Sequence, residues 1–315
     1  MIDIYYLKEY GKIWANYEKA DFELFKYKKG SYSVVYPILK RRIDNKWRDV
    51  TSPYGYSGPF TNSRDKNFYL EFRQAFNLYC QKNNIISEFI RFHPLLENHF
   101  DARGIIPLKK RGQTVWVDLL KSTDQLLSDF RKGHRNIIRK SQNNNVLVKL
   151  ESPQKINQFY RLYIDTMKRK KSINFYLFSE KFFKNHFNKL NNNIFWLGAY
   201  YLDKLIAGAI FLKSANFLHY YFAGSDDQYL SLSPGTLILW EAIKIGKKLG
   251  LHKFHLGGGI DDKLFFYKSG FSDNRADFCT GEIIHNRKIY NLLTQKNGTP
   301  KGNYFPLYRQ LSSKI

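Results

Sequence analysis

The segment from His255 to Phe271 is the densest group of residues that could carry chemistry in this sequence. It reads HLGGG, then Asp261 and Asp262, then LFFYKSGF. Three glycines between an expected strand and an expected helix let backbone approach a bound molecule closely, and the unpaired amides that open such a helix attract an anion. The segment lacks the GxxxxGKS/T and GxGxxG spacings of nucleotide loops, and an isolated glycine motif is more often a tight turn.

Other familiar chemistries are not expected. The cysteines, Cys80 and Cys279, are far apart and have no metal-ligand spacing, so we expect two reduced thiols. HExxH and CxxC motifs are absent, and we expect no bound metal.

Charge is the most unusual feature of the composition. Lys and Arg number 51 against 27 Asp and Glu, a formal net charge of +24. An AT-rich genome enriches lysine, but it would enrich Asp and Glu as well. The surplus therefore favours a polyanionic partner: RNA, a pyrophosphate-linked substrate or an anionic membrane face. A basic run at 131–140 would bind such phosphates or form a solvated face.

Alternating strands and helices must position these residues. In the first half, hydrophobic patterns and turn residues predict a helix at 64–81 and strands at 21–27, 32–40, 47–51, 85–92 and 115–119. In the second half they predict helices at 153–169, 179–190, 234–249 and 261–268 and strands at 146–150, 194–201, 205–213, 217–223, 252–256 and 276–285.

The two halves repeat one order of elements. Each has a hairpin, a third strand, a long helix and a strand that ends in a polar motif, RFHP at 91–94 and FHLGGG at 254–259. An internal duplication explains this order. We expect an α/β fold with a first domain at 1–140, a second at 141–295 and a loosely held tail at 296–315.

The order HLGGG and then DxLFxYKxGF resembles the second-domain signature of the Fem family. These are peptidoglycan-bridge aminoacyltransferases, related to GNAT-type acyltransferases of polysaccharide clusters. TSPYGYSGP, HYYFAGSDD and LSPGTLILWEAI also match, and the matches cover about three quarters of the chain in their order and spacing. The resemblance implies two tandem GNAT-like domains with mixed sheets flanked by helices, the first on the acceptor side and the second on the donor and catalytic side.

The resemblance implies that Lys268 is catalytic. An amine that attacks an ester or thioester builds negative charge on the carbonyl oxygen, which a fixed cation stabilises. Such an activated donor needs no protein nucleophile, which fits the absence of a GxSxG elbow. His93 stands where related proteins place an acidic residue. It would take the proton of the amine or orient it, or else be a capping or core histidine, and this departure puts identical chemistry in doubt.

Further residues are expected to bind substrate. Arg91, on the same strand as His93, would hold an anionic group. Tyr54, Tyr56 and Tyr221 would support a sugar or a flat chain, although Tyr221 could equally be a core aromatic residue. Two positions open the helix where GNAT enzymes bind the coenzyme A pyrophosphate, and four belong to the glycine motif: Ser233, Gly235, Gly257, Gly258, Gly259 and Asp261.

Together these features predict an acyltransferase that forms an amide on an amino group of a peptidoglycan or surface-polysaccharide precursor. The donor would be aminoacyl-tRNA or acetyl-CoA, with no bound cofactor, and Gly235 without the usual glycine-rich loop favours aminoacyl-tRNA. The acceptor would be lipid-linked or nucleotide-linked. The start of the sequence does not resemble a signal peptide, so we expect a cytoplasmic protein, in peripheral contact with the inner membrane face. The alternatives are an acetyl-CoA-dependent sugar N-acetyltransferase and a noncatalytic RNA-binding protein.

Overall fold

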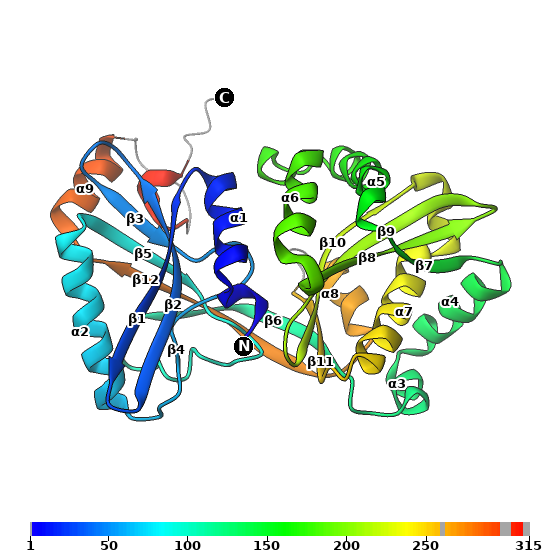
Figure 1. Cartoon of the computed structure of the whole chain (residues 1–315), viewed down its shortest axis with the longest axis horizontal. Helices are drawn as coiled ribbons and strands as arrows, with labels where there is room; N and C mark the ends of the chain where they lie inside the picture. The colour runs from blue at the N-terminus through cyan, green and yellow to red at the C-terminus, as the bar shows by residue number, and fades with distance from the viewer. Residues whose placement is uncertain (1, 259–261, 297–303, 311–315) are drawn as a thin grey trace. The chain divides into compact units, whose positions relative to one another are not determined.

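The computed structural model describes residues 2–258, 262–296 and 304–310, which form two compact units (Figure 1). The first unit contains residues 5–112 and 277–315, and the second contains residues 1–4 and 113–276. Two long strands, β6 (Leu108–Asp118) and β12 (Arg275–Ile284), carry the chain from one unit to the other.

A mixed sheet with the strand order β1-β2-β3-β5-β12 forms the centre of the first unit. The antiparallel part consists of β1 (Asp21–Lys29), β2 (Tyr32–Arg42) and β3 (Arg48–Thr51). Next, β3 pairs parallel with β5 (Ile85–Arg91), which pairs antiparallel with β12, and the short β4 (Phe60–Thr61) pairs with β2.

Helices cover both faces of this first sheet (Figure 1). On one face, α1 (Lys8–Glu18) packs so closely that a Cβ atom on Gly11 would lie 2.0 Å from the ring of Phe22 in β1. On the other face, Phe25 of the same strand packs against the aromatic residues of α2 (Lys66–Lys82). The alternation of strand side chains between the two faces explains this division.

The second unit has the strand order β6-β11-β10-β9-β8-β7. Its antiparallel strands are β7 (Leu147–Glu151), β8 (Ile194–Tyr201), β9 (Lys204–Lys213) and β10 (Phe217–Ser225). Then β10 pairs parallel with β11 (Lys253–Gly257), and β11 pairs antiparallel with β6.

The second sheet is also covered on both faces. Trp196 of β8 contacts Phe159 at 6.0 Å between ring centres, whereas the next residue, Leu197, belongs to the opposite hydrophobic core. Trp196 faces α5 (Ile156–Arg169) and α6 (Glu180–Leu190), and Leu197 faces α3 (Thr123–Asp129), α4 (Lys132–Asn143) and α7 (Pro234–Lys248). Ser179 caps α6, since its side chain accepts a hydrogen bond from the Phe182 amide.

The two units repeat one connectivity. Three antiparallel strands, a long helix and a parallel fourth strand occur as β1-β2-β3-α2-β5 and again as β8-β9-β10-α7-β11. The RFHP motif starts at the end of β5 and the FHLGGG motif starts in the equivalent strand β11. The predicted α/β fold of two related domains is therefore confirmed. The strand next to the parallel fourth strand does not follow it in the chain order of its own unit. In the first unit, β5 pairs with β12, which comes after all the strands of the second unit; in the second unit, β11 pairs with β6, which comes directly after β5.

This exchange of β6 and β12 makes the compact units differ from the predicted domains. We expected a boundary near residue 140, but the chain changes unit inside β6 and again inside β12. Leu126 and Ile138, which precede the expected boundary, lie in the hydrophobic core of the second unit.

We expected a loosely held tail at 296–315, but for residues 304–310 this prediction is wrong. Tyr308 is only 4% exposed, and its hydroxyl forms hydrogen bonds with Ser87 at 2.8 Å and Asp49 at 3.1 Å. Residues 297–303 and 311–315 lie outside the described part of the chain.

The sequence patterns did not predict α1, α3 or α9 (Arg287–Lys296), and they gave no structure to the basic stretch that forms α4. Among the helices in the described ranges, none combines the length and the apolar character needed to cross a membrane.

Candidate functional site

The helix α8 (Asp262–Ser269), which contains the predicted catalytic lysine, is held by two other helices of the second unit. The hydroxyl of Tyr267 lies 3.1 Å from Oγ1 of Thr236 in α7, and the carbonyl of Tyr267 accepts a hydrogen bond from Nε2 of His134 in α4 at 2.9 Å. Gly270 follows α8 directly, and a Cβ atom there would lie 2.1 Å from the His134 ring. These contacts fix the position of α8 and of its side chains.

Lys268 is a buried lysine with 7% exposure. Its Nζ atom donates a hydrogen bond to the carbonyl oxygen of Gly258 at 2.7 Å and lies 5.8 Å from the ring centre of Tyr220. Burial, and to a smaller degree the charge of Lys170, lower the pKa of Lys268 from 10.5 to about 8. Near that pH, Lys268 can stabilise an oxyanion as a cation or accept a proton as an amine.

The first two glycines of the motif lie at the end of β11. Gly257 has a φ of +75°, a conformation that favours glycine, and a Cβ atom on Gly258 would lie 3.1 Å from the carbonyl oxygen of Gln113. The carbonyl of Gly258 accepts the hydrogen bond of the catalytic candidate, Lys268. Gly259 and Asp261 lie outside the described residues, and a substrate-binding role for this motif stays a prediction.

Tyr221 is held by a buried histidine. Nδ1 of His186 lies 2.8 Å from the carbonyl oxygen of Phe182, which can only accept, so Nδ1 carries the proton. Burial lowers the pKa of His186 to about 4, so the ring is neutral at neutral pH. Its Nε2 atom therefore accepts a hydrogen bond from the Tyr221 hydroxyl at 3.2 Å. This bond holds the partly buried Tyr221 ring in place, and its role in substrate binding stays a prediction.

Ser233 and Gly235 form the start of α7. Ser233 has a φ of +52°, and its side chain makes no capping hydrogen bond. A Cβ atom on Gly235 would meet no atom within 4 Å, so the first turn of the helix is open at that position. Binding of donor phosphates here stays a prediction.

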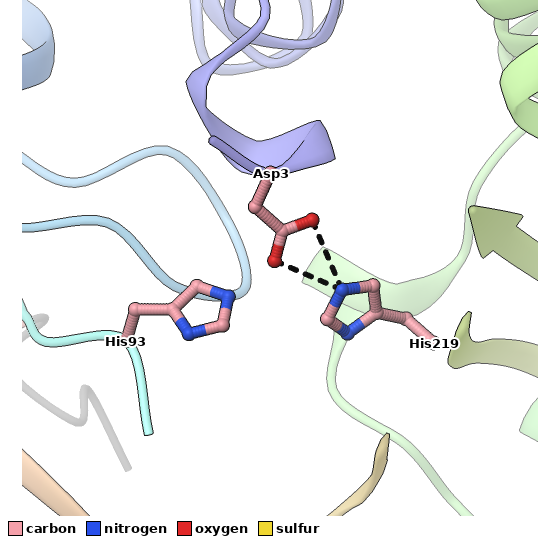
Figure 2. Close-up of side chains that lie close together, drawn as sticks. All are labelled: Asp3, His93 and His219. Atoms are coloured by element: carbon pink, nitrogen blue, oxygen red, sulfur yellow. Dashed lines mark hydrogen bonds and ion pairs between the residues drawn. The ribbon is translucent and has the colours of Figure 1, made fainter. Parts of the chain in front are cut away.

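A buried polar group that the sequence did not reveal lies in the same unit. Asp3 accepts hydrogen bonds from Nε2 of His219 at 3.0 and 3.1 Å (Figure 2). It also accepts one from Oγ of Ser214 at 2.6 Å. Nδ1 of His219 lies 3.4 Å from Nδ1 of His255, its partner in the register of β10 and β11. None of these four residues is more than 6% exposed.

The chemistry of this group follows from its acceptors. An ionised Asp3 can only accept, so Nε2 of His219 is a donor, and in the neutral form of the ring Nδ1 is the acceptor. The Nδ1 atom of His255 is then the donor in the contact between the two rings. An acid followed by an oriented imidazole is the arrangement by which enzymes fix a histidine tautomer. Both histidines belong to motifs quoted above, but sequence patterns do not pair either with Asp3.

Arg91, Tyr54 and Tyr56 belong to an aromatic cluster of the first unit. The guanidinium of Arg91 lies 5.8 Å from the ring centre of Tyr54 and 5.6 Å from that of Phe278, which also contacts Tyr56. Tyr54 stacks on Trp14 at 4.4 Å. Arg91 forms no ion pair with any residue that the structure describes. Its geometry is therefore compatible with the predicted binding of an anionic group.

His93 is completely buried, and its orientation limits its chemistry. The backbone amide of Leu96 donates a hydrogen bond to Nδ1 of His93 at 3.2 Å, so the neutral ring carries its proton on Nε2. In this tautomer the Nδ1 lone pair is engaged and Nε2 is a donor. The geometry therefore disfavours the removal of a proton by His93 and favours the alternative role of orienting a group by donation.

The predicted site residues belong to different units. Lys268 lies in the second unit, whereas His93, Arg91, Tyr54 and Tyr56 lie in the first.

A segment of the second unit matches a known family model. Residues 128–269, less than half of the chain, match the model described as an acetyltransferase (GNAT) domain. The chain has a GNAT-like α/β fold with two related domains.

Solved structures share this fold over most of the chain at low sequence identity. FemX has a TM-score of 0.73 at 11% identity, with 89% of this chain and 92% of FemX covered. The C-terminal domain of a putative lysylphosphatidylglycerol synthetase from Agrobacterium fabrum has a TM-score of 0.56 at 12% identity, with 90% of each chain covered. L-PGS from Bacillus licheniformis has a TM-score of 0.56 at 12% identity, with coverage of 89% and 93%.

These identities show a shared fold alone. The resemblance to the Fem family is confirmed at that level. No curated protein matches the sequence.

Proposed function

We propose that this protein transfers an aminoacyl or acyl group from an activated ester or thioester to an amino group of a peptidoglycan or surface-polysaccharide precursor. The observation that carries the proposal is Lys268, a buried lysine in the GNAT domain that is held on the Gly258 carbonyl and has a pKa of about 8. Buried groups with shifted pKa values concentrate at functional sites.

The reaction follows from the chemistry of the donor. The acceptor nitrogen attacks the donor carbonyl carbon, a C–N bond forms, and the carbonyl oxygen becomes negatively charged. The charged form of Lys268 stabilises this oxygen by donating a hydrogen bond. The C–O or C–S bond of the donor then breaks, and the proton lost by the attacking nitrogen neutralises the leaving group directly or through solvent.

Aminoacyl-tRNA is the donor that we favour. The net charge of +24 supports a polyanionic donor, and the lysylphosphatidylglycerol synthetase that shares the fold is named for an aminoacylated product. Acetyl-CoA is the second candidate, because the matched family model describes an acetyltransferase domain. The acceptor would be lipid-linked or nucleotide-linked, and a lipid-linked acceptor would require peripheral contact with the inner membrane face.

One experiment tests the proposal and separates the donors. The purified protein would be incubated with extracted envelope precursors and with either mixed aminoacyl-tRNA or acetyl-CoA, and the precursors analysed by mass spectrometry. We expect the mass of an amino-acid residue with aminoacyl-tRNA, formed about a hundredfold more slowly by the Lys268→Ala variant. An acetyl adduct instead would identify the acetyltransferase alternative.

The noncatalytic alternative gives a different pattern. A protein that only binds RNA would leave every precursor unchanged in both reactions, and its affinity for tRNA would not depend on aminoacylation. That result would contradict the proposed function. A titration of tRNA binding against salt, with and without the aminoacyl group, measures the difference.

A further inference from the structure

A pocket of about 310 Å³ lies within the first unit. Its walls come from the turn-rich segment after His93, from the start of β6 and from β12. Pockets for small molecules typically start at about 300 Å³, so this one fits a compact ligand. None of the predicted site residues lines it, and its lining residues serve no role in the proposed transfer reaction.

His99, on the wall of the pocket, is buried and has a ring nitrogen that no described residue pairs with. The residue is 3% exposed, its ring packs 4.2 Å from that of Phe100, and Nδ1 has no partner among the described residues. A buried polar group without a partner loses its hydrogen bonds to water and gains none in return, so such groups are rare and call for a ligand or a water at the site. Burial also lowers the pKa of His99, which keeps the ring neutral and gives it one donor and one acceptor nitrogen.

The charges at the pocket favour an anion. Arg103 lines it, its guanidinium stacks 4.8 Å from the Phe100 ring centre, and it forms no ion pair within the part of the chain that the structure describes. Asp277 is the acidic residue of the lining, and Lys110 pairs with it at 2.8 Å. Two cations against one carboxylate leave a net charge of +1, which Arg103 presents without a competing partner.

The remaining wall is apolar. Ile106 is 4% exposed and Cys279 is 6% exposed, and both line the pocket. Burial raises the pKa of Cys279, so its sulfur is an uncharged thiol at neutral pH and packs as an apolar group. A ligand that satisfies these walls needs a short apolar body together with one anionic, planar head that a guanidinium can bind at two points.

We propose that this pocket binds a small carboxylate, whose head group contacts Arg103 and His99 and whose hydrocarbon part contacts Ile106 and Cys279. The carboxylate accepts from the guanidinium and from the imidazole N–H, which satisfies the buried ring. A phosphate ion fits less well, because it carries more charge and has no apolar part.

The test uses the full chain and isobutyrate as the probe, measured by isothermal titration calorimetry. Isobutyramide, the uncharged analogue, and inorganic phosphate serve as the comparison ligands. A ligand with so few atoms should bind with a dissociation constant of about 1 mM. We expect isobutyrate to bind at one site and isobutyramide and phosphate to bind at least about tenfold more weakly.

Variants locate the binding. Arg103→Gln should weaken isobutyrate binding about tenfold or more, since it removes a charge-assisted hydrogen bond. His99→Phe should do the same while keeping the ring contact with Phe100. Arg42→Gln, a change of an exposed arginine in the same unit, is the matched control and should have no effect. Since Arg103 is itself exposed, its variant should fold even if the His99 variant does not.

A second readout is alkylation of the pocket thiol. Isobutyrate should slow the reaction of Cys279 with iodoacetamide, with the fully buried Cys80 as an internal reference. The proposal is wrong if isobutyrate and isobutyramide bind equally, if Arg103→Gln behaves like Arg42→Gln, or if no probe binds. It fails or succeeds independently of the transfer reaction, because calorimetry and alkylation measure no turnover.

Discussion

Replacing Lys268 with alanine tests the central residue of the proposed reaction. Lowering the pKa from 10.5 to about 8 means that the site disfavours the charged ammonium by about 3 kcal/mol. A negative charge that forms beside the ammonium during the reaction relieves this cost, whereas a neutral carbonyl does not. The loss of transition-state stabilisation should therefore be of similar size, and Lys268→Ala should slow the chemical step about a hundredfold.

The assay is a single-turnover measurement with saturating acceptor, across pH. Lys268 is charged below its pKa, so a rate that depends on the cation is retained below about pH 8 and falls above it. Lys268→Arg keeps the charge at all accessible pH values, so it should restore part of the rate and abolish the alkaline decrease. Lys263→Ala, which removes an exposed lysine from the same helix, is the matched control and should be fully active.

Two outcomes would refute this reasoning. A normal single-turnover rate for Lys268→Ala would mean that the lysine is structural. A rate that rises through pH 8, combined with an inactive Lys268→Arg enzyme, would mean that the neutral amine acts as a base and not as a cation.

Three further predictions concern stability and the position of α8. Glu88 accepts hydrogen bonds from Arg73 at 2.9 and 2.8 Å, and although burial opposes ionisation, this pairing lowers the pKa of Glu88 from 4.5 to about 2. The ionised Glu88 therefore stabilises the folded state fully above pH 4.5, and this stabilisation is lost as the pH falls towards 2. In urea titrations at neutral pH, Glu88→Gln should lower the free energy of unfolding by about 3 kcal/mol. Lys268 has a lower pKa in the folded state, so folding releases protons between about pH 8 and 10.5 and stability rises with pH in that window. Lys268→Met should therefore raise the melting temperature in calorimetry at pH 7 and lose this advantage as the pH approaches 10.5. Gly270→Ala places a methyl group against the His134 ring, so it should displace α8 and lower both the melting temperature and the turnover rate. The double variant Gly270→Ala with His134→Ala removes that clash and should restore part of the melting temperature and part of the turnover rate.

Much of the fold could be predicted because local patterns match local structure. The expected strand at 194–201 coincides with β8, and the expected helix at 234–249 agrees with α7 to within one residue. The helix α1 was missed for a physical reason. Gly11 lowers the helix propensity in its middle, but the ring of Phe22 occupies the space that a Cβ atom would need, so packing outweighs propensity.

The domain boundary could not be predicted from local patterns. A strand carries its hydrophobic alternation in its own residues, but the choice of sheet depends on distant partners. β12 has the pattern of any strand, and only its pairing of Thr280 with Arg91 shows that it belongs to the first sheet.

The same limit applies to the site. The motif identified Lys268, but its burial and its contact with Gly258 depend on how α8 packs. The pairing of His219 with Asp3 joins positions far apart in the sequence, and no spacing rule indicates it. The tautomer of His93 depends on a hydrogen bond from the amide of Leu96, and no sequence pattern indicates that bond.

The exchange of β6 and β12 has a consequence for the order in which the protein is made. While the ribosome synthesises the chain, β5 keeps an unpaired edge after Arg91, because its antiparallel partner begins only at Arg275. The second sheet, in contrast, already has β6 when β11 emerges at Lys253, and it can close first. N-terminal domains usually fold first during synthesis; here the N-terminal sheet waits for almost the whole chain, with an open strand edge exposed to wrong partners in the meantime. A nascent chain released before Arg275 would therefore carry all six strands from β6 to β11 but no partner for the open edge of β5.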